Sequence, residues 1–308
     1  MRFGLHLPQG ELAEPRRDVI RTAQEAERIG YDGLWVMERT LFPLEPADGM
    51  YGVPGLAWAE SYQHITEPLT VLTLVAGVTE RVRLGTGILV AGLHPAHQLA
   101  RSFATLDQLT GGRTVLGLGA GWSSDEFRAA GADIRGRGRA LEETIDACRA
   151  LWGPNPVSYR DSRMVVDNAL VSPKPVGTIP VLVGGGYSDA ALDRIARKAD
   201  GWLPSGQGPD AVAATWKRIK DLAADHGRDP AELELHVQVQ PVVTEAALGA
   251  DRMPGRGSMA QVVEDLAAFA EAGASEIVVA LIDARSADDG IEKAAAVLTA
   301  ADEAGLHG

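Results

Sequence analysis

Cysteine and lysine are scarce in this sequence. Its 308 residues include one cysteine, Cys148, which excludes an internal disulfide and any metal cluster built on cysteine thiolates. Lysine occurs five times, and no lysine lies at the end of a strand predicted below, so a barrel enzyme with a Schiff-base mechanism lacks its nucleophile. The lysines are Lys174, Lys198, Lys217, Lys220 and Lys293.

Long apolar runs and excess positive charge are also missing. The longest stretch without a charged side chain, 84–100, contains His94 and His97 and falls short of the roughly 20 apolar residues that span a membrane. The first residues lack the features of a signal peptide, so we expect a cytoplasmic protein. The net charge of −13 disfavours binding to phosphate backbones and anionic lipids, so neither nucleic acid nor membrane is an expected partner.

The sequence instead repeats one unit: a short apolar run, turn residues and an amphipathic segment. Runs rich in Val, Ile and Leu predict buried parallel strands at 2–7, 33–37, 82–90, 114–118, 179–184, 201–204, 233–242 and 276–282. Helical spacing predicts helices at 15–29, 67–78, 95–109, 139–151, 188–198, 209–225, 258–272 and 290–304. Eight alternations without a break in composition predict an α/β fold, a (β/α)8 TIM barrel, as a single domain over 1–308.

Two insertions, at about 39–65 and 153–178, exceed ordinary loop length. The first follows the second strand and therefore lies at the carboxyl face, where TIM-barrel enzymes place their sites. It holds four of the 16 aromatic residues, which indicates an apolar lid over the substrate or a dimer interface. They are Phe42, Tyr51, Trp58 and Tyr62. The second insertion follows the fourth predicted helix, starts at the opposite face and predicts a small hairpin around 161–162.

Glycine is concentrated after the fourth and fifth strands, at 117–121 and 184–186. Glycine lets the main chain approach a ligand closely, and free N–H groups at a helix start bind anions, so we expect a phosphate near 185–188. A tight strand-to-helix turn would leave the same pattern. Within the third strand, Gly85 and Gly87 indicate either a bulge or a flat ligand against the main chain, or else a packing constraint of the barrel.

Together these segments resemble the bacterial luciferase-like flavin and deazaflavin oxidoreductases. The resemblance covers almost the whole chain and is carried by 3–5, 26–36, 81–90, 94–95, 104–113, 117–122 and 172–175. The sequence is most similar to the branch that uses coenzyme F420, a 5-deazaflavin. FMN is the alternative cofactor. The resemblance implies a TIM barrel, usually dimeric, with the cofactor ring at its mouth and a non-prolyl cis peptide bond between Gly87 and Ile88.

The resemblance and the glycine and arginine clusters define the residues expected to bind the cofactor. Phosphate is expected at 184–188 and the ring near Glu38 and 119–122. The full set is His6, Glu38, Thr86, Gly87, Ile88, Gly119, Ala120, Gly121, Trp122, Arg137, Arg139, Gly184, Gly185, Gly186, Tyr187 and Ser188.

One position departs from the family pattern. Sugar-phosphate and alcohol dehydrogenases of the deazaflavin branch carry a histidine beside the acidic residue that ends the second strand, whereas Arg39 follows Glu38 here. Arginine stays protonated and cannot act as a general base, so alcohol oxidation by that mechanism is disfavoured. Arg39 could instead bind a carboxylate or polarise a carbonyl, which favours reduction of an activated C=C or C=N bond. Alternatively, it forms a surface ion pair with Glu38 or Glu45.

The expected catalytic residues are Glu38, Arg39, Tyr62, His64 and His94, with no metal site. Tyr62 and His64 are candidate proton donors, and His94 is expected to face the mouth.

Three arginines at 135–139 lie at the start of the following helix, where the helix dipole is positive and repels cations. We therefore expect them to bind an anion, such as the phosphate or glutamate tail of the coenzyme. Alternatively they pair with acidic side chains, namely Asp125, Glu126, Glu142 and Glu143.

These observations predict an oxidoreductase that transfers a hydride between a reduced deazaflavin and a small organic substrate, with a homodimer as the expected assembly. Two other functions stay open. One is a two-component FMN monooxygenase, which needs reduced flavin and oxygen, and the other is a flavin-binding protein without turnover.

Overall fold

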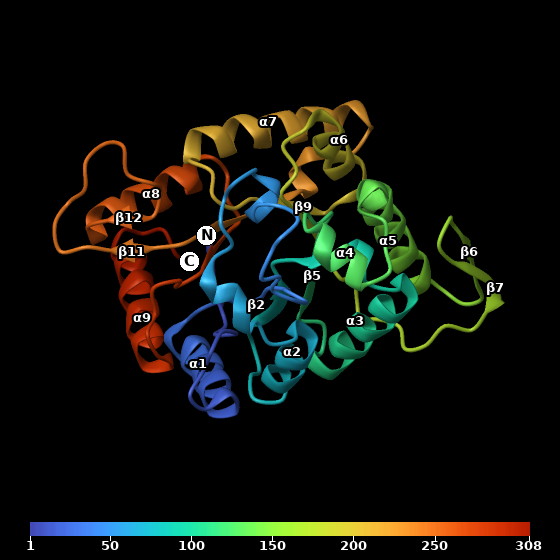
Figure 1. The fold of residues 1–308 in the computed structure, drawn as a ribbon, viewed down its shortest axis with the longest axis horizontal. Coiled ribbons are helices and arrows are strands. Elements are labelled where there is room, and N and C mark those ends of the chain that lie inside the picture. Colours follow the sequence, from blue (N-terminus) through green and yellow to red (C-terminus); the bar gives the residue numbers. More distant parts are fainter.

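Eight parallel strands close into a barrel in the computed structural model, which describes residues 1–308 (Figure 1). In chain order they are β1 (Arg2–His6), β2 (Gly33–Val36), β3 (Arg83–Thr86) continued by β4 (Leu89–Val90), β5 (Thr114–Gly119), β8 (Val181–Gly184), β9 (Gly201–Leu203), β10 (Glu234–Val239) and β13 (Glu276–Val279). β1 pairs with both β2 and β13, and β3 pairs with β5, so the ring has no free edge. The predicted (β/α)8 barrel is confirmed.

Helices surround the barrel in the predicted order (Figure 1). They are α1 (Pro15–Ile29), α2 (Pro68–Ala76), α3 (Ala96–Thr110), α5 (Arg137–Trp152), α6 (Asp189–Lys198), α7 (Pro209–Asp225), α8 (Met259–Glu271) and α9 (Ala287–Glu303). The short α4 (Ser124–Ala129) escaped prediction because six residues contain too little helical periodicity. None of the helices combines the length and apolarity needed to cross a bilayer.

The remaining elements are short. The 3-10 helices are η1 (Met50–Gly52), η2 (Glu60–His64), η3 (Ala91–Leu93), η4 (Ile134–Gly136) and η5 (Pro230–Glu232). After β10 the strands β11 (Val242–Val243) and β12 (Arg256–Gly257) form a separate parallel pair. The predicted strand 233–242 is therefore two elements, because β10 ends at Val239.

Trp35 fills the interior of the barrel and is fully buried. A Cβ atom on Gly85 would lie 2.5 Å from Cζ3 of Trp35, so glycine at 85 is a packing requirement and not a ligand contact. The same buried cluster contains Val115, Leu182, Leu203 and Val278, one from each of four other strands.

A polar network closes the amino-terminal end of the barrel. Its two carboxylates, Glu234 and Glu276, are the first residues of β10 and β13. Nε1 of Trp35 donates to Glu276 at 2.8 Å, and Glu276 is also bonded by an arginine of β3. Arg2 and Arg83 neutralise the two carboxylates, and Nε2 of His236 lies 2.6 Å from Glu234.

The third barrel strand is interrupted between β3 and β4, where the expected cis peptide bond between Gly87 and Ile88 is present. The Ile88 side chain lies across the neighbouring strands. A Cβ atom on either Gly119 or Gly184 would lie 2.6 Å from Ile88. These two glycines therefore make room for Ile88.

The hairpin predicted near 161–162 is formed by β6 (Val157–Arg160) and β7 (Val165–Ala169), which lie outside α5 (Figure 1). Its tip reaches toward the barrel mouth. Arg163 donates to the carbonyl oxygen of His94 at 3.0 Å and to Oγ1 of Thr144 at 3.2 Å. The insertion starts at the amino-terminal face, but its tip contacts the segment that precedes α3.

Candidate active site

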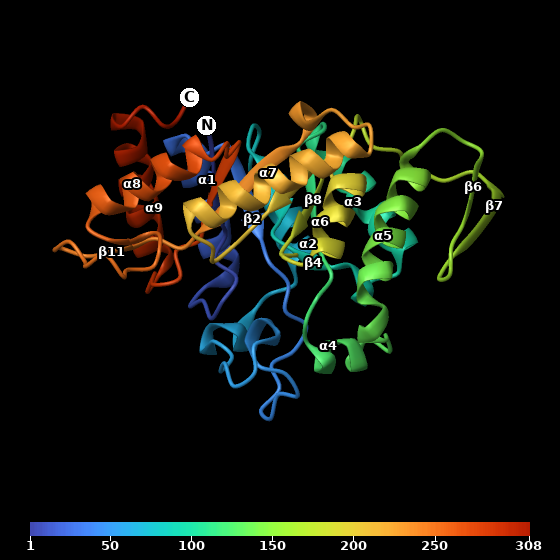
Figure 2. The same ribbon diagram turned by 90° about the horizontal axis from the view of Figure 1, so that it is seen from above.

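The carboxyl ends of the strands and the segments that follow them form one end of the barrel. Figure 2 shows the segment after β2, residues 37–67, and α4 projecting together from this end. Most of the predicted site residues follow β1, β2, β5 or β8, or lie within β3 and β4.

The buried Glu38 pairs with the partly exposed His94 at this end. The Glu38 side chain is 4% exposed, and its Oε1 lies 2.7 Å from Nε2 of His94. Its other oxygen accepts the backbone N–H of Val90 at 2.8 Å. Burial lowers the pKa of His94, but the hydrogen bond and the charge of Glu38 together outweigh burial and raise it above its ordinary value. The pair therefore favours a protonated imidazole.

The pKa of His6, the last residue of β1, is shifted in the opposite direction to that of His94. Its Nε2 atom is buried and has no hydrogen-bond partner in the protein. A Cβ atom on Gly87 would lie 3.5 Å from this nitrogen, so the imidazole lies beside the break between β3 and β4. Burial lowers the pKa of His6 to about 4, although Gln238 opposes the shift, so the ring is neutral at pH 7. A neutral ring nitrogen without a partner in the protein is available for a hydrogen bond to a polar group of a bound ligand.

Arg39 is buried, which corrects the alternative of a surface ion pair with Glu38 or Glu45. Its side chain is 6% exposed, and its Nη1 lies 2.9 Å from Glu126 of α4, which is 2% exposed; this contact is an ion pair without hydrogen-bond geometry. Nε of Arg39 donates to the backbone carbonyl of Glu38 at 2.8 Å. The true partner could not be predicted, because Glu126 is 87 positions away and lies on the unpredicted helix α4.

Aromatic side chains surround the Arg39 guanidinium. Its Cζ lies 4.8 Å from the ring centroid of Trp122 and 5.7 Å from those of Trp58 and Tyr62. The rings of Trp58 and Trp122 are 4.6 Å apart, and Tyr51 packs edge-on against Trp122 at 5.8 Å. We call Tyr51, Trp58 and Trp122 the aromatic wall.

The segment after Glu38 is fastened to α4 by polar contacts. Thr40 donates to Glu126 through its backbone N–H at 2.8 Å and its hydroxyl at 3.1 Å. Asp48 accepts the backbone N–H of Ser124 at 2.7 Å, and the backbone N–H of Ala47 donates to Asp125 at 2.8 Å. The loops after β2 and β5 therefore form one connected unit at the barrel mouth.

The two predicted proton donors lie in different surroundings. The hydroxyl groups of Tyr62 and Tyr51 are 2.7 Å apart. Burial and the neighbouring Tyr51 raise the pKa of Tyr62, so its hydroxyl keeps its proton at neutral pH. His64 is 56% exposed, and its imidazole lies 4.0 Å from Glu11. The structure therefore places Tyr62 beside Arg39 and His64 on the outer surface.

The glycine turn after β8 leads into α6. Gly185 and Gly186 have φ values of 70° and 78°, a left-handed conformation that glycine adopts without strain. No atom lies within 4 Å of a Cβ placed on Gly185, so this part of the turn is open. Ser188 caps the helix by accepting the N–H of Ala191. An open turn at the start of a ten-residue helix fits an anion such as phosphate.

Arginines at the start of α5 lie close to α6. A Cβ atom on Gly138 would lie 2.8 Å from Nη2 of Arg194 in α6, so the two helices are in contact there. Arg137 is exposed and donates only to the carbonyl of Ile134. Arg139 is 3.9 Å from Glu143.

Most of the alternative partners expected for these arginines have other contacts. Asp125 and Glu126 hold the segment after β2, and Glu142 pairs with Arg194 and Arg197. Arg135 pairs with Asp133 instead, at 2.9 Å. Of the four predicted acidic partners, only Glu143 lies near one of the three arginines.

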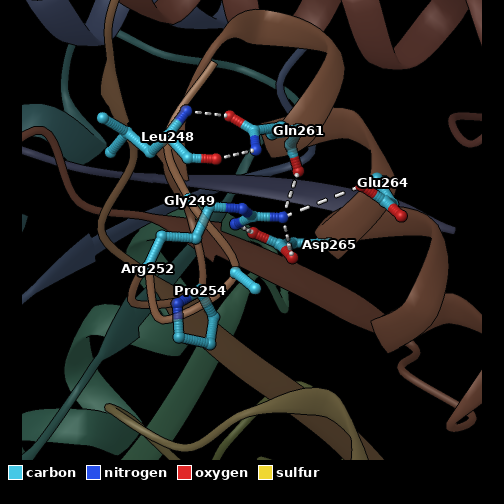
Figure 3. Close-up of a pocket in the computed structure, with 8 residues that line it drawn as sticks. Leu248, Gly249, Arg252, Pro254, Gln261, Glu264 and Asp265 are labelled. Carbon is cyan, nitrogen blue, oxygen red and sulfur yellow. Dashed lines mark hydrogen bonds and ion pairs between the residues drawn. The ribbon is translucent and has the colours of Figure 1, made fainter.

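A separate cavity of about 330 Å³ lies between the loop after β11 and α8 (Figure 3). Its polar side chains already bond to their neighbours: Arg252 pairs with Asp265, and Gln261 bonds both backbone groups of Leu248 at 2.8 Å. None of its lining residues was predicted as a site residue. The cavity therefore has no part in the candidate site.

Comparison with known proteins gives the family. Residues 1–253 match the model of the luciferase-like monooxygenases. The chain belongs to this family.

Curated proteins are similar to much of the chain. An uncharacterized protein of Mycobacterium tuberculosis is 32% identical in an alignment of 285 residues that covers 90% of this chain and 92% of that protein. Pyrimidine monooxygenase RutA of Escherichia coli is 31% identical over 196 residues, covering 61% of this chain and 53% of that protein.

Two solved structures share the fold over most of their length. A coenzyme F420-dependent secondary alcohol dehydrogenase matches with a TM-score of 0.77 at 17% identity, over 97% of this chain and 99% of that one. A monooxygenase of Streptomyces bottropensis matches with a TM-score of 0.77 at 18% identity, over 96% of both chains. At these identities the likeness concerns the fold alone.

Proposed function

We propose that this protein is an oxidoreductase that transfers a hydride between reduced coenzyme F420 and a small organic molecule, reducing an activated C=C or C=N bond. The coenzyme supplies the hydride when bound. The protein supplies orientation, an apolar surrounding and the proton that completes the reduction.

The observation that carries this proposal is that two neighbouring helices, α5 and α6, each begin with a feature that favours an anion. The open turn at Gly185 and Gly186 starts α6, and the exposed Arg137 and Arg139 lie at the start of the neighbouring α5. A coenzyme with both a phosphate and a glutamate tail would use both features, whereas FMN has only the phosphate. The solved structures that share this fold include F420-dependent enzymes and a riboflavin lyase with modified FMN, so the fold is compatible with either cofactor.

Glu38 and His94 are the groups we assign to proton transfer. Glu38 raises the pKa of His94, which favours the protonated imidazole, and we assign to this group the proton that the substrate receives as the hydride arrives. Hydride and proton together add two hydrogens across the double bond. Arg39 cannot act as a base on an alcohol, because it stays protonated and is paired with Glu126.

The cofactor assignment is tested by charge reversal. Arg137→Glu and Arg139→Glu together should weaken binding of F420 by at least about tenfold, because two attractive charges become repulsive. FMN binding should change less. The matched control reverses Arg101 and Arg218, which are exposed on α3 and α7 and make no polar side-chain contact. Unchanged F420 affinity in the first variant would refute the role of these arginines.

The second candidate function is a two-component FMN monooxygenase. The 31% identity to pyrimidine monooxygenase RutA supports it over 61% of the chain. Purified protein should be mixed with each reduced coenzyme, with and without oxygen. Oxygen-dependent turnover with FMN alone would replace the F420 proposal, and coenzyme binding without conversion of any substrate in a library would indicate a flavin-binding protein without turnover. The homodimer stays a prediction, which light scattering tests.

A further inference from the structure

Ionisable side chains at the barrel mouth occur in pairs. Glu38 lies 2.7 Å from His94 and raises its pKa, and Arg39 lies 2.9 Å from the carboxylate of Glu126. The remaining histidine, His6, is neutral because burial lowers its pKa. Of these five residues, each of the two carboxylates therefore faces a basic side chain, and His6 is uncharged. We call these five residues the inner part of the mouth.

The charge of Arg39 is compensated a second time by the aromatic side chains. Its guanidinium lies over the rings of Trp58, Tyr62 and Trp122, whose faces attract cations. Its Nε is bonded to the backbone carbonyl of Glu38. An incoming anion would thus compete with a carboxylate, three rings and a carbonyl for this cation.

We propose that the site takes a neutral, planar substrate against the aromatic wall, and that Glu126 sets this selectivity by cancelling the charge of Arg39. This inference rests on the proposed function, since it concerns the substrate of the same site. A carboxylate that entered the site would lose its hydration without gaining a free cation, whereas a flat neutral ring buries apolar surface against Tyr51 and Trp122.

The outer surface differs from this inner part. Arg137 and Arg139 are exposed at the start of α5, where they can attract an anion in water. Anionic groups are therefore expected at the start of α5 and α6, and uncharged groups beside the aromatic wall. Glu126 is a positioning residue in this arrangement, because it acts through Arg39.

The test compares three probes of similar shape and different charge: benzamide, benzoate and benzamidine. Calorimetric titration of the coenzyme-bound wild-type protein should show benzamide binding at least about tenfold more tightly than either charged probe. Glu126→Gln leaves Arg39 without its carboxylate, so the preference should move at least about tenfold toward benzoate. Arg39→Gln leaves Glu126 alone, so the preference should move toward benzamidine. The double variant should again prefer benzamide.

The design separates selectivity from folding. A purely structural role would weaken all three probes together in the single variants, and that result would overturn the proposal. The double variant contains neither charge, so it keeps the test valid if a lone buried charge prevents folding. Asp221→Asn makes the same charge change on the exposed face of α7, where Asp221 pairs with Lys217, and should leave all three affinities unchanged.

The outcomes also separate this inference from the cofactor assignment. Wild-type protein that binds benzoate as tightly as benzamide, or binds none of the three probes while binding a coenzyme, would overturn the inference and leave the cofactor assignment intact. Failure to bind F420, with the preference for benzamide kept in the FMN complex, would overturn the cofactor assignment alone.

Discussion

Nε2 of His94 lies 2.7 Å from a carboxylate oxygen of Glu38, although the two residues are 56 positions apart. The carboxylate raises the pKa of the imidazole against the effect of burial. Glu38→Gln removes the charge and keeps the burial, which lowers the pKa, so the pKa of His94 should fall. An NMR titration of the His94 imidazole measures this pKa in both proteins. His97, which is exposed in α3, is the internal control, because its signals should be the same in the two proteins.

The stability of this variant should depend on pH in a defined direction. Because the pKa of His94 is raised in the folded state, protonation of His94 stabilises the fold. This stabilisation is complete at pH values below the unfolded-state pKa of about 6.5 and is lost as the pH rises through the folded-state pKa. The difference in unfolding free energy between wild type and Glu38→Gln should therefore be largest in mild acid. A difference that grows as pH rises would contradict the assignment.

His6 should make the protein sensitive to acid. Its folded pKa of about 4 lies below the unfolded value of about 6.5, so the unfolded state takes up the proton first and stability falls as pH drops between these values. The full loss is on the order of 3 kcal/mol. Urea unfolding at several pH values should show a smaller loss in His6→Gln than in wild type; equal losses would show that His6 is not responsible.

Ile88 and Gly184 should be coupled in stability. Gly184→Ala places a methyl group 2.6 Å from Ile88, so we expect a cost of about 1–3 kcal/mol. Ile88→Ala removes the obstructing atoms, and the double variant should be more stable than the sum of the single changes predicts. Denaturant unfolding of the four proteins gives the interaction energy. Gly136→Ala is the control, because no atom lies near its Cβ position and its φ is −85°.

Asp48 should hold the segment after β2 against α4. Asp48→Ala removes the acceptor for the backbone N–H of Ser124, which costs about 1 kcal/mol, a typical value for a lost helix cap. Hydrogen exchange should then become faster across residues 40–64 and unchanged in the barrel strands. Glu45→Ala, an exposed change in the same segment without a polar contact, is the control. Equal exchange in all three proteins would rule out this role for Asp48.

Periodic features of the fold were predictable from the sequence. α1 and α7 have the predicted bounds, because their apolar residues recur at helical spacing and each begins with proline. The third strand illustrates the limit. Composition predicts one run over 82–90, whereas the structure breaks it at Gly87 and Ile88; the interior glycines indicated a possible bulge, but only the resemblance to a family indicated the cis peptide bond.

The candidate site was predictable only in part. Proximity to a strand end marked Glu38 and the glycine turn at 184–186, because parallel strands bring their carboxyl ends together. The partner of Arg39 was missed because side-chain pairing depends on the path of two long loops. Glycine also has two physical uses, and sequence cannot separate them: Gly85 makes room for Trp35, whereas Gly185 leaves an open turn.

The polar network at the amino-terminal end of the barrel has a consequence for synthesis on the ribosome. Trp35 and Glu276 are 241 positions apart, and Arg2 from β1 joins the same carboxylates. A nascent chain that has not yet reached β13 exposes the edges of its first and last completed strands and leaves Arg83 without Glu276. Such distant contacts slow folding, and the exposed strand edges of the incomplete barrel can pair with other chains until β13 closes the ring.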